Sequence, residues 1–320
     1  MEDRRVKLAD VARVAGVSRA SASRALNGGY GVSAEVRRRV REVADRLGFE
    51  PHGAARALAT GRASAGSRER IEIVIVDPDP QALSAKPFYG RVLTGAAQAL
   101  AGHDVALELK LVPAPPSVDG DPPFGRILIN MPPLPAAAYA RHGRNIALGA
   151  SAPGVPFVAP DNRGGGHQAA AHLVTTGRRR VGAVFGPDTP CARERQDGFL
   201  RMMAGAGLTV VSAHGDFTRA TAYAAAKQLL AREPRLDAIF AACDVSAMGV
   251  LQALREAGRR VPDDVAVVGF DGSALADAAD LSSIFMPAEE EAASAVQHLL
   301  DPALPPPARL PTALTVRGSS

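Results

Sequence analysis

Cysteine is scarce in this 320-residue chain: Cys191 and Cys243 stand far apart and form no Cys-x-x-Cys pair or Cys/His cluster. That arrangement indicates neither a disulfide framework nor a zinc site. Long apolar runs are also missing, because no stretch of about 18 uncharged apolar residues occurs. The opening "MEDRRVKLAD" lacks the apolar segment of a secretory signal. We therefore expect a cytoplasmic protein with reduced thiols, no metal and no membrane partner.

Complete catalytic motifs are missing as well. The glycine-rich stretch "NRGGGHQ" has neither the Gly-Lys-Ser/Thr of a P-loop nor a G-x-G-x-x-G turn. His167 and His172 are spaced wrongly for one helix face, and no H-E-x-x-H occurs. The segment "GFDGS" lacks the G-x-S-x-G elbow of a nucleophilic serine. With no set of nucleophile, base and orienting group, the sequence predicts a protein that is not an enzyme and has no cofactor.

The positive charge is confined to one end of the chain. Residues 1–70 hold 15 Lys and Arg against 8 Asp and Glu, whereas the remaining residues hold 22 against 25, for a total of +4. A concentrated basic surface attracts a polyanion by releasing its counterions. Charge by itself leaves two interpretations open, a nucleic-acid partner or a basic surface without one.

Residues 7–47 read as three short helices. Apolar residues recur at helical spacing from Leu8 to Ala15, and Gly16 suits the left-handed end of a helix. Ser18 can cap a second helix that runs to about residue 26, and Ser33 can cap a third. Two helices joined by a glycine turn predict a helix-turn-helix, which presents its second helix to the DNA major groove.

The second helix, "GVSRASASRALN", is built almost wholly from small and hydroxylic residues. Small side chains allow close approach to bases, and serine hydroxyls bond phosphates or base edges. Arg19 and Arg24 can reach guanine or phosphate. The plainer alternative is an exposed polar helix with no partner.

From residue 71 onward, strand and helix patterns alternate in two series. The first contains "IEIVIVD", "VALELKLV" and "GRILINM", and the second contains "RRVGAVFG", "DAIFAA" and "VAVVGFD". Alternation with short loops predicts parallel sheets flanked by helices, and two series predict two α/β lobes. The proline-rich "VPAPPSVDGDPPFG" (112–125) interrupts the first series, so we expect lobe 1 to lack a helix there.

The order of residues closely resembles the LacI/GalR family of bacterial transcription regulators over almost the whole chain. The matching segments are "LADVARVAGVSRASASRALNG", "PHGAARALATG", "KPFYGRVLTGAAQAL", "PDNRGGGHQAAAHLVTTG", "CARERQDGF" and "VPDDVAVVGFDGS". The resemblance implies a helix-turn-helix DNA-binding domain (1–49), a hinge helix and linker (50–70), and a two-lobed periplasmic-binding-protein-like domain for effector binding and dimerisation (71–320). Lobe 1 would comprise about 71–160 and 288–302, and lobe 2 about 161–287 and 303–320.

The same resemblance assigns residues that contact DNA. Ser18, Arg19, Ala20 and Arg24 fall where the family reads base edges, Ser21 and Ser23 lie near the backbone, and Asn27 matches at the helix end. In the hinge, Leu58 takes the place of a minor-groove wedge with Ala55 beside it. Without the resemblance, Leu58 would be an ordinary linker residue. Ala22 stands where the family commonly has valine.

The effector cleft is assigned in the same way. The residues implied are Phe88, Tyr89, Asp161, Arg195, Phe217, Cys243, Asp244 and Asp271. Arg195 and Asp271 would anchor polar groups of the ligand, Phe217 would stack on it, and Tyr89 or Phe88 would close the other side. The alternatives are a surface arginine, a core phenylalanine, and helix caps for Asp161 and Asp271.

Two departures from the family pattern make this cleft more apolar. Cys243 replaces an asparagine, and Met286 replaces a glutamine. A thiol is a poor partner for a sugar hydroxyl. We therefore expect a homodimeric repressor on a pseudo-palindromic double-stranded DNA operator, modulated by a small molecule that is sugar-like or more apolar. The alternatives are an effector-independent architectural DNA binder and, less favoured, a small-molecule enzyme with an appended basic head.

Overall fold

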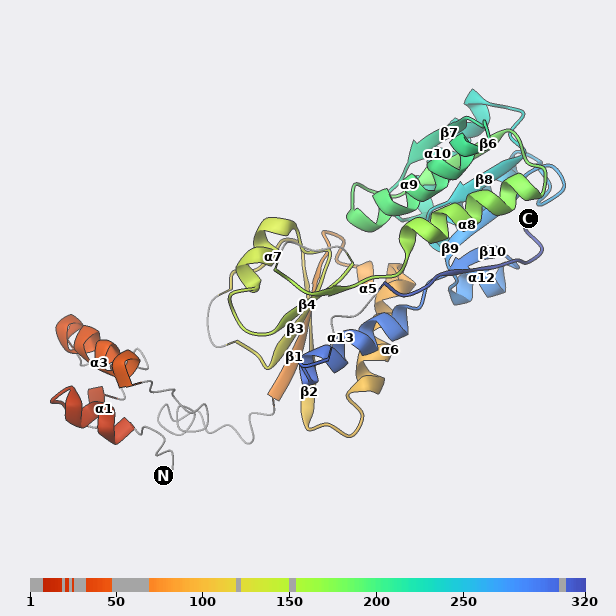
Figure 1. Cartoon of the computed structure of the whole chain (residues 1–320). Helices are drawn as coiled ribbons and strands as arrows, with labels where there is room; N and C mark the ends of the chain where they lie inside the picture. The colour runs from red at the N-terminus through yellow and green to blue at the C-terminus, as the bar shows by residue number, and fades with distance from the viewer. Residues whose placement is uncertain are drawn as a thin grey trace. The chain divides into compact units, whose positions relative to one another are not determined.

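The computed structural model describes residues 8–18, 21–22, 25, 33–47, 69–118, 122–149, 154–304 and 309–320. The chain divides into two compact units, 1–68 and 69–320. The first is helical, and the second contains two sheets with helices around them (Figure 1).

The first unit packs two helices, α1 (Leu8–Val14) and α3 (Ala34–Leu47), around a small core. As predicted, Gly16 follows α1 with a φ of +65°. Ser18 caps the next turn, because its Oγ accepts the N–H of Ser21 at 3.0 Å. Ser33 caps α3 in the same way, with the N–H of Val36 at 3.3 Å. The core residues are Val11, Ala12, Ala15, Ala22, Ala25, Val40, Val43 and Ala44.

Lobe 1 of the second unit is built on a five-stranded sheet in the order β2-β1-β3-β4-β5, with every pair parallel. The strands are β1 (Glu69–Val76), β2 (Val105–Val112), β3 (Gly125–Ile129), β4 (Asn145–Leu148) and β5 (Phe157–Val158). One face packs against α6 (Pro87–Ala99) and α13 (Ala288–Leu300), with the short α5 (Ala82–Ala85) beside them. The other face packs against α7 (Pro133–Tyr139).

The proline-rich segment leaves part of the lobe 1 sheet without a covering helix. As predicted, no helix forms in its described parts, 113–118 and 122–124. Charged side chains occupy this region of β1, β2 and β3 instead. Glu72 is only 3% exposed and lies 2.9 Å from Lys110 Nζ and 3.1 Å from Arg126 Nε. Arg126 also lies over the Tyr139 ring, 5.3 Å from its centroid. Ion pairs therefore neutralise the carboxylate that the sheet buries.

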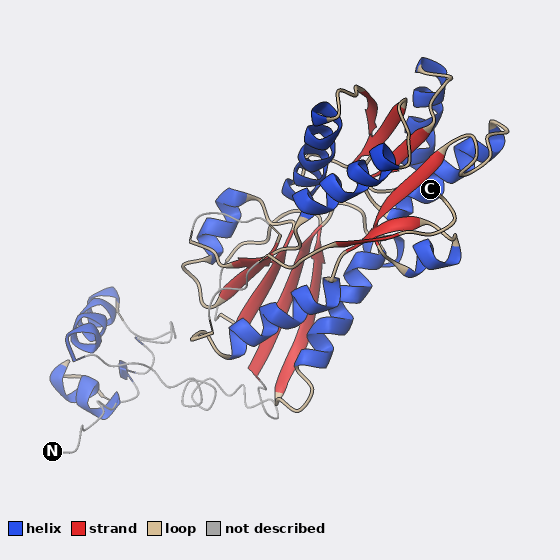
Figure 2. Cartoon of the chain, turned by 45° about the vertical axis from the view of Figure 1, so that its right-hand side comes forward, coloured by secondary structure: helices blue, strands red, loops and turns tan. Residues whose placement is uncertain are grey.

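Lobe 2 is built on a six-stranded sheet in the order β11-β10-β9-β8-β6-β7, in which only β11 is antiparallel to its neighbour. The strands are β6 (Val181–Phe185), β7 (Val210–His214), β8 (Ala238–Ala241), β9 (Ala266–Asp271), β10 (Ser282–Phe285) and β11 (Ala313–Thr315). Helices α8 (Asn162–Thr175) and α9 (Pro190–Gly205) cover one face. Helices α10 (Arg219–Arg232), α11 (Asp244–Glu256) and α12 (Ala274–Ala278) cover the other (Figure 2).

Two glycines bring α8 and α9 into close contact. A Cβ added at Gly166 would lie 2.1 Å from the carbonyl oxygen of Arg195, and one at Gly198 would lie 2.0 Å from that of Arg163. Both distances are to backbone atoms, which cannot move aside cheaply. The absence of side chains at these two positions therefore fixes how α9, and Arg195 on it, lies against α8.

The chain passes between the lobes near residues 159–161, 286–288 and 310–312. Pro160 and Leu310 form a parallel bridge, and the N–H of Asp161 donates to the Leu310 carbonyl at 2.7 Å. Within the residues described, no helix is both long enough and apolar enough to span a membrane.

Candidate functional site

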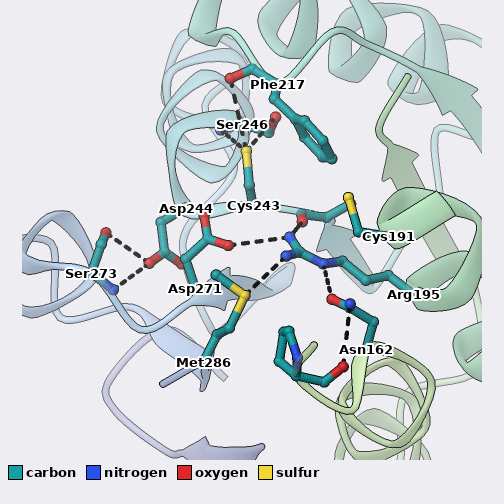
Figure 3. Close-up of polar contacts among 12 residues, drawn as sticks. Asn162, Cys191, Arg195, Phe217, Cys243, Asp244, Ser246, Asp271, Ser273 and Met286 are labelled. Atoms are coloured by element: carbon teal, nitrogen blue, oxygen red, sulfur yellow. Dashed lines mark hydrogen bonds and ion pairs between the residues drawn. The ribbon is translucent and has the colours of Figure 1, made fainter. Parts of the chain in front are cut away.

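Arg195 and Asp271 meet beyond the carboxyl ends of the lobe 2 strands. Asp271 is the last residue of β9, and Arg195 projects from α9 and is 5% exposed. Its Nη1 donates to the Ala242 carbonyl at 2.7 Å and to Asp271 Oδ1 at 3.1 Å, and its Nε donates to Asn162 Oδ1 at 2.9 Å (Figure 3). In parallel sheets this edge is where ligands bind.

Sulfur and aromatic groups complete the surroundings of the guanidinium. Its Nη2 contacts Met286 Sδ at 3.3 Å, and Cζ lies 3.9 Å from the Phe270 ring centroid and 5.8 Å from that of Phe217. Phe217 has a φ of +67°, which is unusual for a side chain of this size. Its ring occupies the space that a Cβ at Gly186 would fill, at 2.3 Å. The glycine after β6 therefore makes room for Phe217 beside Arg195.

Asp244 lies close to this pair but is used inside lobe 2. It is 0% exposed, and its Oδ2 accepts from Ser273 N at 2.7 Å and Ser273 Oγ at 2.8 Å. Its Oδ1 accepts from Ser283 Oγ at 2.6 Å. Burial raises the pKa of Asp244, and burial also raises the pKa of Asp271 against the opposing effect of Arg195. Of the two carboxyls, only Asp271 is partly open, with 17% of its side chain exposed.

Cys243 caps a helix. Its Sγ accepts the Ser246 N–H at 3.3 Å, at the start of α11, and contacts Ser246 Oγ at 3.1 Å. The residue is 5% exposed, and burial raises the pKa of the thiol to about 12. The side chain is thus directed at the helix backbone, where an asparagine or serine commonly serves as N-cap.

Lobe 1 contributes a hydrogen-bonded cluster at the carboxyl ends of its own strands. Asp77, which follows β1, accepts from Tyr89 Oη at 2.7 Å and from Lys86 Nζ at 2.7 Å. Asn130, which follows β3, donates to Tyr89 Oη at 2.9 Å. Tyr89 is 3% exposed, and burial raises its pKa. Phe88 packs against the cores of both lobes.

Sequence reasoning singled out Tyr89 and Phe88 but missed Asp77, Asn130 and Asn162. A signal was available for Asp77 and Asn130, because each directly follows a buried parallel strand, where functional side chains collect. Asp161, for which two interpretations were open, caps α8: its Oδ1 accepts the Gly164 N–H at 2.8 Å. The neighbouring Asn162 holds Arg195 instead.

In the first unit, the structure places two of the residues that we assigned to DNA. Ser18 is exposed and Ser21 is half-buried, and their hydroxyls are 2.9 Å apart. Arg19, Ala20, Ser23, Arg24, Asn27, Ala55 and Leu58 lie outside the described residues. Ala22 and Ala25 are fully buried. The small side chains at these two positions therefore belong to the core of the first unit.

No cluster of three or more His, Cys, Asp or Glu side chains suited to a metal ion occurs in the part of the chain that the structure describes.

Residues 7–52 match the lacI family of bacterial regulatory proteins, and residues 170–320 match a periplasmic binding protein-like domain. The HTH-type transcriptional regulator CelR of Thermobifida fusca is 35% identical over 311 residues, which cover 89% of this chain and 88% of that protein. The chain belongs to the LacI family.

Other members of the LacI family are also similar to this chain over most of its length. The HTH-type transcriptional repressor CytR of Escherichia coli K12 is 30% identical over 91% of this chain and 88% of that protein. A solved transcriptional regulator CelR–cellobiose complex is 31% identical, with a TM-score of 0.71, and covers 99% of this chain and 100% of that chain. The lac repressor dimer bound to operator has the same fold, with a TM-score of 0.69 at 21% identity over 99% of both chains. This LacI-family protein is a DNA-binding transcription regulator and not an enzyme.

Glu291 is a further buried carboxyl near the site. It lies in the first turn of α13, is 2% exposed, and its Oε2 has no hydrogen-bond partner within the described part of the chain. Burial raises its pKa to about 8, against the opposing effects of the Arg195 charge and the Gly149 N–H.

We expect Glu291→Gln to be increasingly more stable than the wild type as the pH rises from 5 to 8. The folded pKa lies above the ordinary 4.5, so the contribution of Glu291 to stability is complete below 4.5 and is lost as the pH passes about 8. The difference in the free energy of unfolding should grow by about 1 kcal/mol per pH unit. Urea unfolding at several pH values measures it, with the exposed neighbour Glu290→Gln as control. Parallel pH profiles for wild type and Glu291→Gln would contradict the prediction.

Proposed function

We propose that the protein is a homodimeric repressor that binds a pseudo-palindromic operator and responds to a saccharide bound between the lobes. The observation that carries the ligand proposal is the Arg195–Asp271 pair at the carboxyl ends of the lobe 2 strands. Arg195 contacts Oδ1 of Asp271, so the second carboxylate oxygen, Oδ2, can accept a hydrogen bond from a sugar hydroxyl. The Phe217 ring can stack on the apolar face of a sugar ring. Phe88 and Tyr89 would close the cleft from lobe 1.

The relative CelR supports cellobiose as the first probe, because that protein has been solved as a cellobiose complex at 31% identity to this chain. The site is less polar than it would be with an asparagine at position 243 and a glutamine at position 286. Met286 offers only a thioether, and the Cys243 thiol is occupied at the start of α11. We therefore propose a ligand whose recognition relies on Asp271 and on stacking more than on amide contacts.

A second candidate function is supported by how completely Arg195 is satisfied within the protein. Asn162, Ala242, Asp271 and Met286 all accept from its guanidinium. A cleft whose main cation already has partners is compatible with an effector-independent architectural DNA binder. Titration of the purified protein with cellobiose and related saccharides, in the presence and absence of operator, separates the two.

The decisive experiment for DNA recognition is selection of random duplex DNA by the full-length protein at near-physiological salt. A homodimer with two helix-turn-helix units should select a pseudo-palindrome with a fixed centre. Adding cellobiose to the protein bound to that sequence should then change its operator affinity, since a ligand acts only by binding two states unequally. Selection of no consensus would overturn the sequence-specific repressor and favour phosphate binding alone.

We expect Leu58→Ala to weaken binding to the selected operator far more than binding to random duplex. The resemblance places Leu58 as a wedge between base steps, and losing it removes the bent duplex that allows further contacts. A loss of roughly tenfold or more on operator, with little change on random DNA, would match the cost of one specific contact. Fluorescence anisotropy at fixed salt measures both affinities.

The matched control for this prediction is Leu83→Ala. It truncates a leucine that is 37% exposed on α5, which lies outside the positively charged first unit. It should leave both DNA affinities unchanged. Equal losses on operator and random DNA in Leu58→Ala would remove the wedge from the proposed function.

A further inference from the structure

Arg91 connects the two lobes through one guanidinium. It projects from α6 of lobe 1, and its Nη1 donates to the Asp271 carbonyl at 2.9 Å while its Nη2 donates to the Met286 carbonyl at 2.8 Å. Its Nε and Nη2 also reach Glu289, at 2.8 Å and 2.6 Å. Only 16% of the Arg91 side chain is exposed, and its Cζ lies 5.4 Å from the Phe285 ring centroid. These contacts span the junction between lobe 2 and α13.

The close approach of α6 to the start of α13 gives Arg91 this reach. A Cβ at Gly95, one turn further along α6, would lie 2.1 Å from the carbonyl oxygen of Glu289. The two helices therefore touch backbone to backbone at this point. Arg91 therefore lies beside residues 286–287, which connect β10 to α13.

Arg91 and Arg195 contact different atoms of the same two residues. Arg195 contacts the side chains of Asp271 and Met286, and Arg91 contacts their backbone carbonyls. The two residues are also joined directly, because the Met286 N–H donates to the Asp271 carbonyl at 3.2 Å. One arginine comes from each lobe, and between them they fix both the backbone and the side chains of this pair.

The backbone at Asp271 needs such support. Its φ is +113°, a conformation that residues with side chains rarely adopt and that persists only when the surroundings hold it in place. Part of the support is local, since the Gly272 N–H donates to Ser283 Oγ at 3.1 Å. Further support comes from the Met286 N–H and from the charged guanidinium of Arg91, which both donate to the Asp271 carbonyl. Hydrogen bonds from a charged donor are stronger than those between neutral groups.

We propose that Arg91 is a positioning residue for the ligand site: from lobe 1 it holds Asp271 and Met286 in the orientation in which their side chains contact Arg195. A ligand that engages the Asp271 carboxylate acts on a residue whose carbonyl is bound to α6. Arg91 thus couples ligand binding at Asp271 to lobe 1. The ion pair between Arg91 and Glu289 contributes less to this positioning than the two carbonyl contacts do. The Glu289 side chain is 40% exposed, and water and salt screen such pairs.

The first test uses hydrogen–deuterium exchange on the full-length protein without ligand. Arg91→Lys keeps a positive charge for Glu289 but cannot span two carbonyls, whereas Glu289→Gln keeps the carbonyl contacts and removes the ion pair. We expect the amides of Gly272 and Met286 to exchange about tenfold faster in Arg91→Lys, and within about twofold of wild type in Glu289→Gln. Amides of α10 should stay unchanged in both.

Three results would overturn the positioning role. The first is wild-type exchange at Gly272 and Met286 in Arg91→Lys. The second is a rise in Glu289→Gln equal to that in Arg91→Lys, which would show that the ion pair alone matters. The third is an increase in exchange across all of lobe 2, because it would indicate a general loss of stability.

The second test concerns ligand affinity and rests on the proposed function. With cellobiose as probe, we expect calorimetric titration to give about tenfold weaker binding for Arg91→Lys, comparable to the loss of one charge-assisted contact. Arg201→Lys is the matched control, because Arg201 pairs with Asp197 on the exposed side of α9. No cellobiose binding by the wild type would refute the proposed ligand, and the exchange experiment would still decide the role of Arg91.

Discussion

Replacement of Arg195 by methionine is expected to lower the free energy of unfolding by about 3–5 kcal/mol and to abolish binding of any ligand that uses Asp271. The cost follows from removing one member of a buried ion pair, which leaves the other charge uncompensated. Asp271, Ala242 and Asn162 would all lose their donor. Urea unfolding of the full-length protein followed by circular dichroism measures the change.

Two further variants identify the source of this effect. Arg201→Met removes an exposed arginine from the same helix and should change stability by less than about 0.5 kcal/mol. The double variant Arg195→Met with Asp271→Asn should recover part of the loss, because the uncompensated carboxylate is gone. If the double variant were less stable than the single one by the full cost of Asp271→Asn, the charge argument would be wrong.

The second large effect is expected from Gly198→Ala, which should destabilise the protein by about 3 kcal/mol. Its new Cβ would lie 2.0 Å from the Arg163 carbonyl oxygen, so α8 and α9 must separate. Overpacking of a core usually costs up to about this amount, and here the obstacle is backbone. The midpoint and slope of urea unfolding report the loss.

Gly205→Ala is the matched control, because Gly205 ends the same helix and its added Cβ would have no atom of another element within 4 Å. This variant should be as stable as the wild type or slightly more stable, since alanine favours a helix over glycine. Equal stabilities for Gly198→Ala and Gly205→Ala would mean that α8 and α9 do not pack as closely as described.

The sequence predicted the elements that local patterns determine. Gly16 and the two serine caps were read from residue type and position, and the parallel strands from continuous apolar runs. The absence of a helix in the described residues 113–118 and 122–124 followed from the prolines of this segment. Membership in the LacI family came from the order of residues and was confirmed by the relatives.

The site was less predictable, because its contacts join residues far apart in the chain. Arg195 and Asp271 were predicted as ligand anchors, but their hydrogen bonds to each other, to Asn162 and to Met286 depend on the register of α9 against the sheet. Nothing near Arg91 in the sequence marks it, since its partners come from β9, β10 and α13. The use of Asp161 and Cys243 as helix caps also depends on where α8 and α11 begin, and helix boundaries are the least certain part of a sequence-based assignment.

The burial of Cys243 gives the two thiols of this chain very different reactivities. Cys243 is almost inaccessible, and burial raises the pKa of its thiol to about 12, whereas Cys191 is partly exposed and precedes Arg195 by four residues on α9 (Figure 3). A maleimide dye added to the native wild-type protein should therefore attach at one position, about one helical turn from Arg195. Without any engineered cysteine, the protein could then serve as its own fluorescent reporter in a search for ligands.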